Sequence, residues 1–249
     1  MFWLRRSMIS NESYIFLAVF AALALVALVY LLSPPMSLLE DIAARGAEIR
    51  MRMRELLSQR AYSGTIKTRV LAGYVDIALE HHEAIWLLME RKLTGSALAL
   101  ARPVLDCWIR ALWINAIATE QEIELASRDK FTFPRMREMY DKIKPVYSQA
   151  DTREDIDQLF QYVERLWKIL SSYTHSGGRQ LARRFTRDQV KPSYTDIELA
   201  QAFNLPTMVM LLLMRVFFMS MGDQGDADET QTLATQYFAQ FNEWLNERR

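Results

Sequence analysis

The chain has 249 residues, with 30 basic and 30 acidic side chains, one cysteine and three histidines. A chain without net charge has no overall field that attracts nucleic acid, so any site for a polyanion must be local. One cysteine excludes a disulfide scaffold, and together with three histidines it argues against a Cys/His zinc site. Hydrophobic residues make up 51% of the chain, whereas glycine (8) and proline (7) are scarce, and this composition predicts long helices and an all-α fold.

The N-terminal residues predict a membrane anchor. Residues 1–13 form a weakly basic tail, and residues 14–32 follow without a charged side chain, a length that crosses the hydrocarbon core as one helix. The following residues 33–35 lack the small-residue cleavage pattern of a signal peptide, so we expect a single-pass protein of the bacterial inner membrane rather than a secreted one. The alternative is a buried helix of a soluble domain. Arg5 and Arg6 draw the tail toward the cytoplasm, whereas four arginines after the anchor, between residues 45 and 54, draw the domain there instead. We expect a cytoplasmic domain, because so short a tail can be translocated and a lone thiol gives no sign of an oxidising compartment; a domain outside the cytoplasm is the alternative.

Two further regions follow the predicted anchor. Residues 37–66 are expected to form an amphipathic connecting helix, with Ser37 as N-cap and Glu40 completing a capping box. Residues 67–249 are expected to form a helical bundle domain. Thr195 caps its most apolar segment, which we interpret as the central core helix, with a second membrane element as the alternative. The predicted helices of this domain cover residues 67–92, 97–126, 133–149, 153–173, 196–221 and 229–248.

The adjacent histidines His81 and His82 point about 100° apart on a helix, so they cannot both ligate one ion in the i,i+4 manner. We interpret them as surface or half-buried side chains. Cys107 is interpreted as a buried thiol.

Charged residues mark one face of the second bundle helix, which Gly95 and Ser96 are expected to separate from the first. Arg102, Asp106 and Arg110 stand at i, i+4 and i+8 in an otherwise apolar segment, so they share a face and can pair along it. Because burial of an unpaired charge is costly, this face must reach water or meet partners. It is either the wall of a cleft or an ion pair that braces two helices.

The segment SSYTHSGGRQLARRFTR, residues 171–187, combines a histidine, a glycine pair and four arginines. A helix that runs into it presents Tyr173 and His175 near its end, and Gly177 and Gly178 are expected to form a left-handed C-cap. The guanidinium groups that follow can hold phosphate through paired hydrogen bonds. They belong to Arg179, Arg183, Arg184 and Arg187.

Several enzyme classes are excluded by missing motifs: the sequence has no Walker A loop, dinucleotide fingerprint, G-x-S-x-G elbow or HExxH pair. We expect no metal and no cofactor. A histidine, with an ordinary pKa near neutrality, can move the proton of a ribose 2′-hydroxyl, while arginines hold the phosphate. The pattern therefore suits metal-independent cleavage of RNA.

The segments SALALARPVLDCWIRALW and LSSYTHSGG, with arginines after the second, resemble the HEPN-like all-α superfamily, in particular its bacterial branches related to abortive-infection proteins. The resemblance covers about residues 67–221 and implies a helical bundle, a dimer and a metal-independent endoribonuclease in which four to six residues intervene between an arginine and the histidine that follows it. His175 matches that histidine, but Lys168 occupies the place of the arginine. Either Arg102 or Arg179 supplies the guanidinium in space, or the nuclease chemistry is absent.

Two classes of function remain open. The first is a membrane-anchored endoribonuclease that acts on RNA as an anti-phage or stress effector. The second is a non-catalytic, membrane-tethered bundle that binds a partner or self-associates to signal or perturb the membrane. A homodimer or higher homo-oligomer is expected for both, because the charged stripe and the aromatic-rich helices offer more adhesive surface than one bundle needs. The expected catalytic residues are His175, Arg102 and Asp106, and the expected substrate-binding residues are Tyr173, Arg179, Arg183 and Arg184.

Overall fold

The described part of the chain is all α-helical, which confirms the all-α part of the expected fold class. The computed structural model describes residues 36–58, 64–147 and 153–246, and the predicted anchor at residues 14–32 lies outside them. Apart from one isolated antiparallel bridge, the described residues contain no β-structure. They form nine helices: α2 (Met36–Ser58), α3 (Ile66–Glu90), α4 (Thr94–Ala116), α5 (Glu120–Ser127), α6 (Met136–Tyr147), α7 (Arg153–Thr174), α8 (Gly178–Ala182), α9 (Asp196–Ser220) and α10 (Gln224–Asn246).

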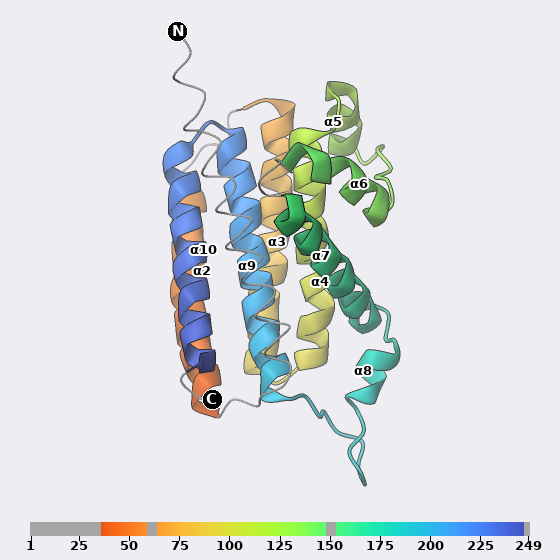
Figure 1. Ribbon diagram of the computed structural model, residues 1–249, viewed down its shortest axis with the longest axis vertical. Helices are drawn as coiled ribbons and strands as arrows, with labels where there is room; N and C mark the ends of the chain where they lie inside the picture. Colours follow the sequence, from red (N-terminus) through yellow and green to blue (C-terminus); the bar gives the residue numbers. More distant parts are fainter. Residues whose placement is uncertain (1–35, 59–63, 148–152, 247–249) are drawn as a thin grey trace.

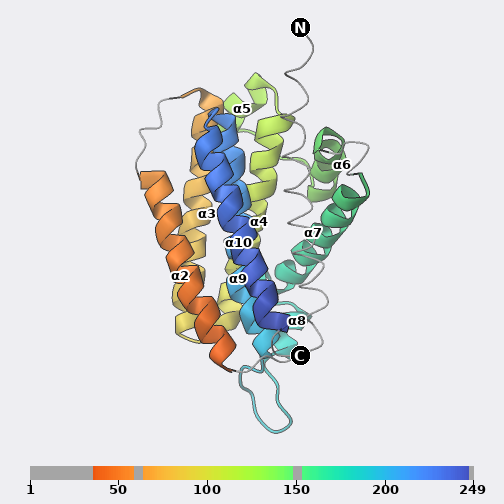
Figure 2. The same cartoon turned by 60° about the vertical axis from the view of Figure 1, so that its left-hand side comes forward.

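Helix α9 is the core helix, as its apolar sequence predicts. It contacts α2, α3, α4 and α10, which surround it in Figures 1 and 2. The expected cap is present, because the Thr195 hydroxyl accepts from the Glu198 N–H at 3.2 Å and the Glu198 carboxylate accepts from the Thr195 N–H at 2.9 Å. Among the described residues, Glu198–Ser220 is the one helical segment long and apolar enough to cross a membrane, and most of it is buried inside the bundle.

Helix α2 packs on α9 and α10 and buries Ile42, Ile49 and Met53 against them. It also approaches α3 closely, because a Cβ at Gly46 would overlap the indole ring of Trp86. The residues that the sequence sets apart as a connecting helix therefore contribute to the same hydrophobic core as the rest of the bundle.

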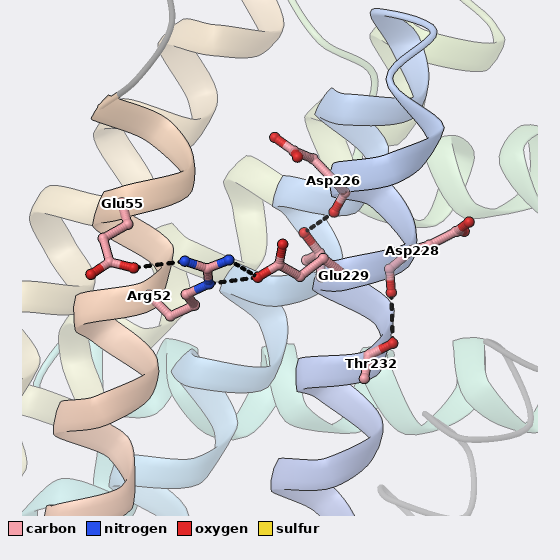
Figure 3. Close-up of polar contacts among 7 residues, drawn as sticks. Arg52, Glu55, Asp226, Asp228, Glu229 and Thr232 are labelled. Atoms are coloured by element: carbon pink, nitrogen blue, oxygen red, sulfur yellow. Dashed lines mark hydrogen bonds and ion pairs between the residues drawn. The ribbon is translucent and has the colours of Figure 1, made fainter.

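An ion pair joins the outer faces of α2 and α10. Figure 3 shows the Arg52 guanidinium between two carboxylates: Glu229 Oε1 lies 2.5 Å away on α10, and Glu55 Oε2 lies 2.8 Å away on α2. Both partners are substantially exposed to solvent, so this pair contributes little to stability.

The predicted helix over residues 97–126 is two helices. α4 begins at Thr94, before the expected break at Gly95 and the expected cap at Ser96, and Leu93 precedes it without a side-chain cap. It ends at Ala116, after which Thr119 begins α5 with a capping box formed with Glu122. The apolar spacing continues across the boundary, so the sequence did not reveal where α5 begins.

His82 is fully buried, which corrects its expected place at the surface. Its Nε2 lies 2.9 Å from Oγ1 of Thr207 on α9 and 3.3 Å from Nε1 of Trp86. The indole N–H of Trp86 donates to Nε2 of His82, and the Thr207 hydroxyl in turn bonds the carbonyl of Phe203 at 2.9 Å. Burial, together with the charges of Arg50 and Arg54, lowers the pKa of His82 to about 3. This histidine is a neutral polar group of the core, whereas His81 is half-buried as expected.

Candidate functional site

The candidate site lies where α4 passes the C-terminal end of α7. Thr174, the last residue of α7, donates its hydroxyl hydrogen bond to the carbonyl of Ala99 on α4 at 3.1 Å. Arg102 lies one helical turn beyond Ala99, and His175 is the residue that follows α7. The packing of these helices therefore brings together two residues that are 73 positions apart in the sequence.

Arg102 and His175 are in direct contact. Nη1 of Arg102 lies 2.8 Å from Nε2 of His175. A guanidinium has only donors, so Nε2 accepts the hydrogen bond, and the proton of the neutral ring lies on Nδ1. The Arg102 side chain is 17% exposed, whereas His175 is exposed, so the contact sits at the edge of the bundle, open to water.

Two side chains fix the position of the Arg102 guanidinium. Asp106 Oδ2 lies 3.7 Å from its Nε, one helical turn along α4. The Trp167 ring of α7 lies beneath it, with Cζ of Arg102 4.4 Å from the ring centroid, and Trp167 Nε1 donates to Asp106 Oδ1 at 3.0 Å. The cation is thus held between a carboxylate and an indole that are themselves hydrogen-bonded.

Trp167 is not among the site residues predicted from the sequence. Its distance of eight residues from His175, about two helical turns, is the signal that could have linked them. An indole in this place contributes both a flat surface for the guanidinium and a donor for the carboxylate.

Asp106 is largely buried at this junction. Burial raises the pKa of Asp106, while the hydrogen bond from Trp167 and the charges of Arg102 and Arg110 act in the opposite direction. Arg110, the third member of the predicted stripe, is exposed and lies with Cζ 4.9 Å from the ring centroid of Phe133. Of the three charged residues on this face of α4, Arg102 and Asp106 therefore pair with each other, whereas Arg110 contacts an aromatic ring.

The turn after α7 differs from the expected glycine cap. The left-handed residue is Ser176, with φ of 53°, whereas Gly177 has φ of −74° and is the N-cap of α8. Gly177 is required for a different reason: a Cβ there would lie 2.6 Å from Oγ of Ser172. Its N–H also bonds the Ser172 carbonyl at 2.6 Å, so the chain folds back tightly beside His175.

The four expected substrate-binding residues lie in different surroundings. Tyr173 is 6% exposed, and its ring faces that of Tyr194 at 6.5 Å, so it belongs to the core rather than to a substrate surface. Arg183 is engaged by Glu198, the capping carboxylate of α9, at 2.6 Å. Arg184 lies beside Gly95 at the start of α4, and Arg179 is exposed on α8.

Away from the α4–α7 junction, a hollow lies between α3 and α5. It is an open groove of about 470 Å³ whose lining includes the apolar side chains of Ile66, Val70 and Ile77, with Arg69 as its charged member. No candidate site residue lines it. We therefore assign the chemistry to the α4–α7 junction, where charged and aromatic groups converge.

Comparison with known proteins gives a family but no activity. Neither the search of curated proteins nor that of solved structures returned a match. In the part of the chain that the structure describes, no group of three or more His, Cys, Asp or Glu side chains is arranged to hold a metal ion. Residues 75–243, which include α4, α7 and every residue of the α4–α7 junction, match the family of unknown function DUF6988, so the chain belongs to this family.

Proposed function

We propose that this protein is a membrane-anchored, metal-independent endoribonuclease of the HEPN-like type. The observation that carries the proposal is the 2.8 Å contact between Arg102 and His175. The resemblance implies a guanidinium beside the histidine, yet Lys168 stands at the expected position and pairs with Glu164 at 2.9 Å. Arg102 supplies that guanidinium from a neighbouring helix. The resemblance alone, rather than any contact, suggests a role in phage defence or stress.

The proposed reaction needs one base and one cation. A phosphate of RNA takes the place of His175 on the Arg102 guanidinium, which frees Nε2 to accept the proton of the adjacent 2′-hydroxyl. The 2′-oxygen then bonds to phosphorus as the bond to the 5′-oxygen breaks, and the departing 5′-oxygen takes up a proton from water, to which His175 later returns the proton that it accepted. The products are a 2′,3′-cyclic phosphate and a 5′-hydroxyl, while Arg102 stabilises the charge that develops on the phosphoryl oxygens.

Asp106 and Trp167 act as positioning residues in this proposal. They touch Arg102 rather than the substrate. They keep the guanidinium next to His175 while its hydrogen bond to the histidine is replaced by one to the phosphate. A fixed cation stabilises a transition state better than a mobile one because it does not have to reorganise during the reaction.

The second candidate function is a non-catalytic bundle in which the same contacts brace two helices. The observation in its favour is that the hydrogen bonds from Thr174 to Ala99 and from Trp167 to Asp106 also bridge α7 and α4. A brace needs these contacts for stability. A nuclease needs Arg102 and His175 for catalysis as well.

The test is cleavage of RNA by the full chain in detergent, with EDTA present to remove metal ions. The unmodified protein is expected to cleave an oligoribonucleotide, and His175→Ala is expected to lose about 10²- to 10⁴-fold in rate, the usual contribution of a general acid or base. Arg165→Ala, at an exposed position on the same helix, is the matched control and should retain activity.

A substrate with a single 2′-deoxynucleotide at the cleaved position should resist cleavage there, because the internal nucleophile is missing. No cleavage by the unmodified protein, or equal cleavage by His175→Ala, would leave the brace as the better account. In that case His175→Ala should lower the unfolding temperature.

A further inference from the structure

One end of the bundle carries a projecting arm, residues 183–193. The chain turns back on itself there: the Thr186 N–H bonds the Gln189 carbonyl at 2.9 Å, and the Lys191 N–H bonds the Arg184 carbonyl at 3.0 Å. In Figures 1 and 2 this loop, drawn between α8 and α9, extends beyond the ends of the helices. The arm is thus a small hairpin held by backbone hydrogen bonds, with little of the bundle around it.

The arm exposes large apolar side chains beside basic ones. Phe185 is 53% exposed and Val190 is 78% exposed, and the two face each other across the antiparallel bridge. Arg187 and Lys191 are exposed next to them, with Asp188 as the acidic residue of the tip. Exposed apolar groups flanked by cations are the composition that enters the boundary between lipid headgroups and acyl chains.

The turn between α3 and α4, residues 91–93, has the same character. It lies at the same end of the bundle as the arm in both views of the ribbon. Arg91 and Lys92 are exposed there, and Leu93 is 51% exposed. Glu90, just before this turn, is the exposed acidic residue beside it. At the opposite end, acidic residues of α5, the turn after it and the start of α10 outnumber the basic ones there: Glu120, Glu122, Glu124, Asp129, Asp226 and Asp228, against Lys67, Arg69, Arg128 and Lys130.

The predicted anchor arrives at this basic end. α2 begins at Met36, and the beginning of α2 lies at the end of the bundle that bears the arm (Figures 1 and 2). Only residues 33–35 separate Met36 from the predicted membrane segment at 14–32. Three residues span at most about 11 Å, so a bilayer that holds the anchor lies close to this end.

We propose that the arm, with the turn at residues 91–93, is a membrane-contact surface that seats the bundle on anionic phospholipid, Phe185 and Val190 entering the headgroup boundary. Of the proposed function this rests only on the membrane anchor and not on the ribonuclease. Basic side chains near a leaflet that bears anionic lipid are attracted to it, and the acidic far end is repelled, so the charges at both ends favour the same orientation.

The test uses the full chain reconstituted into vesicles of phosphatidylcholine with phosphatidylglycerol. Val190→Cys is labelled with the environment-sensitive fluorophore NBD, and Gln121→Cys, exposed on α5 at the far end, is the matched control. Cys107 is buried, and labelling of the unmodified chain measures its background. NBD at position 190 should shift its emission to shorter wavelength and be quenched by doxyl-labelled lipid, whereas NBD at position 121 should show neither effect.

Charge reversal in the arm tests whether the arm is attracted to anionic lipid or is only held near the bilayer by the anchor. Arg187→Glu with Lys191→Glu, both at exposed positions, should reduce the quenching at position 190 when phosphatidylglycerol is present. Equal, unquenched emission at positions 190 and 121 would overturn the proposal. So would a signal at position 190 that ignores lipid and responds to an added oligoribonucleotide, since the arm would then be an RNA surface.

Alkaline extraction of the same vesicles tests the anchor independently. A chain that resists extraction but shows no quenching at position 190 keeps its anchor and refutes the arm. A chain that is extracted, yet is quenched at neutral pH, supports the arm and refutes the anchor. RNA cleavage enters neither readout.

Discussion

His82 and His175 are both held through Nε2, but their surroundings are opposite. His82 is fully buried, with Nε2 in hydrogen-bond contact with the Thr207 hydroxyl and the Trp86 indole, and has no carboxylate among its described contacts. His175 is exposed and accepts from the Arg102 guanidinium. A buried neutral ring cannot take up a proton without a large desolvation cost, whereas an exposed ring beside a cation can exchange protons and partners with a bound anion. The same side chain therefore serves packing in one place and suits chemistry in the other.

The largest expected effect is on activity, and it should arise at the His175 contact and not at His82. Arg102→Lys keeps the charge but loses the planar pair of donors, and we expect RNA cleavage to fall about 10²-fold. The free energy of unfolding should change by less than about 1 kcal/mol. Cleavage assays and urea titrations of the same preparations measure the two quantities. Arg110→Lys, on the same face of α4, is the control, and equal losses in both variants would contradict the role of Arg102.

The next effect should appear in stability alone. His82→Ala removes a buried ring and leaves the Thr207 hydroxyl and the Trp86 N–H without it, so we expect a loss of about 3 kcal/mol in the free energy of unfolding. The rate of RNA cleavage per folded molecule should be unchanged. His81→Ala, at the half-buried neighbour, should cost much less, and a comparable cost there would show that the buried contacts are not the cause.

A smaller loss is expected from Gly46→Ala. The added methyl group would overlap the indole of Trp86, which cannot move far because it packs on His82 and on Phe203 at 4.5 Å between ring centroids. Overpacking of this kind costs about 1–3 kcal/mol. Gly73→Ala, where a Cβ meets nothing within 4 Å, is the matched control and should be neutral or slightly stabilising. Equal stability of the two variants in thermal unfolding would refute the close approach of α2 and α3.

The smallest effect is a dependence of stability on pH. Because the pKa of His82 is lowered to about 3 in the folded protein, the unfolded chain binds more protons between the ordinary histidine pKa and that value. Stability should therefore fall as the pH drops below about 6.5, and His82 should account for about 1 kcal/mol of that loss by pH 5.5. His82→Asn does not titrate there, so its unfolding free energy should fall less over the same interval. Parallel curves for the two proteins would contradict the burial of a neutral ring.

Most of the helical framework could be predicted from local patterns. The spacing of apolar residues located α3, α7 and α9 to within about two residues, and Thr195 with Glu198 marked the start of α9. The start of α5 carries the same signature in Thr119 and Glu122, but it lies inside an apolar run that reads as one helix. Prediction from local sequence failed where two local patterns indicated different structures. At the end of α7, glycines suggested the left-handed turn that Ser176 makes.

The partners of polar side chains were harder to predict because they are distant in the sequence. Charges on an apolar helix implied that Arg102 and Asp106 needed partners, but the indole that supports both belongs to another helix. His82 was expected to be a surface or half-buried side chain, whereas it is buried against Thr207, which lies 125 residues away in the sequence. Periodicity shows which face of a helix is inside, and only tertiary packing decides what that face meets.

Cys107, the single cysteine, lies directly after Asp106 and is buried, and burial raises the pKa of its thiol to about 12. Alkylating reagents require a thiolate in contact with solvent, so the native junction should protect it. Its rate of alkylation then reports how often α4 separates from its neighbours, much as an amide proton reports local unfolding. Cys107 is therefore a built-in probe for the opening of the α4–α7 junction, because it is adjacent in sequence to the carboxylate that pairs with Arg102.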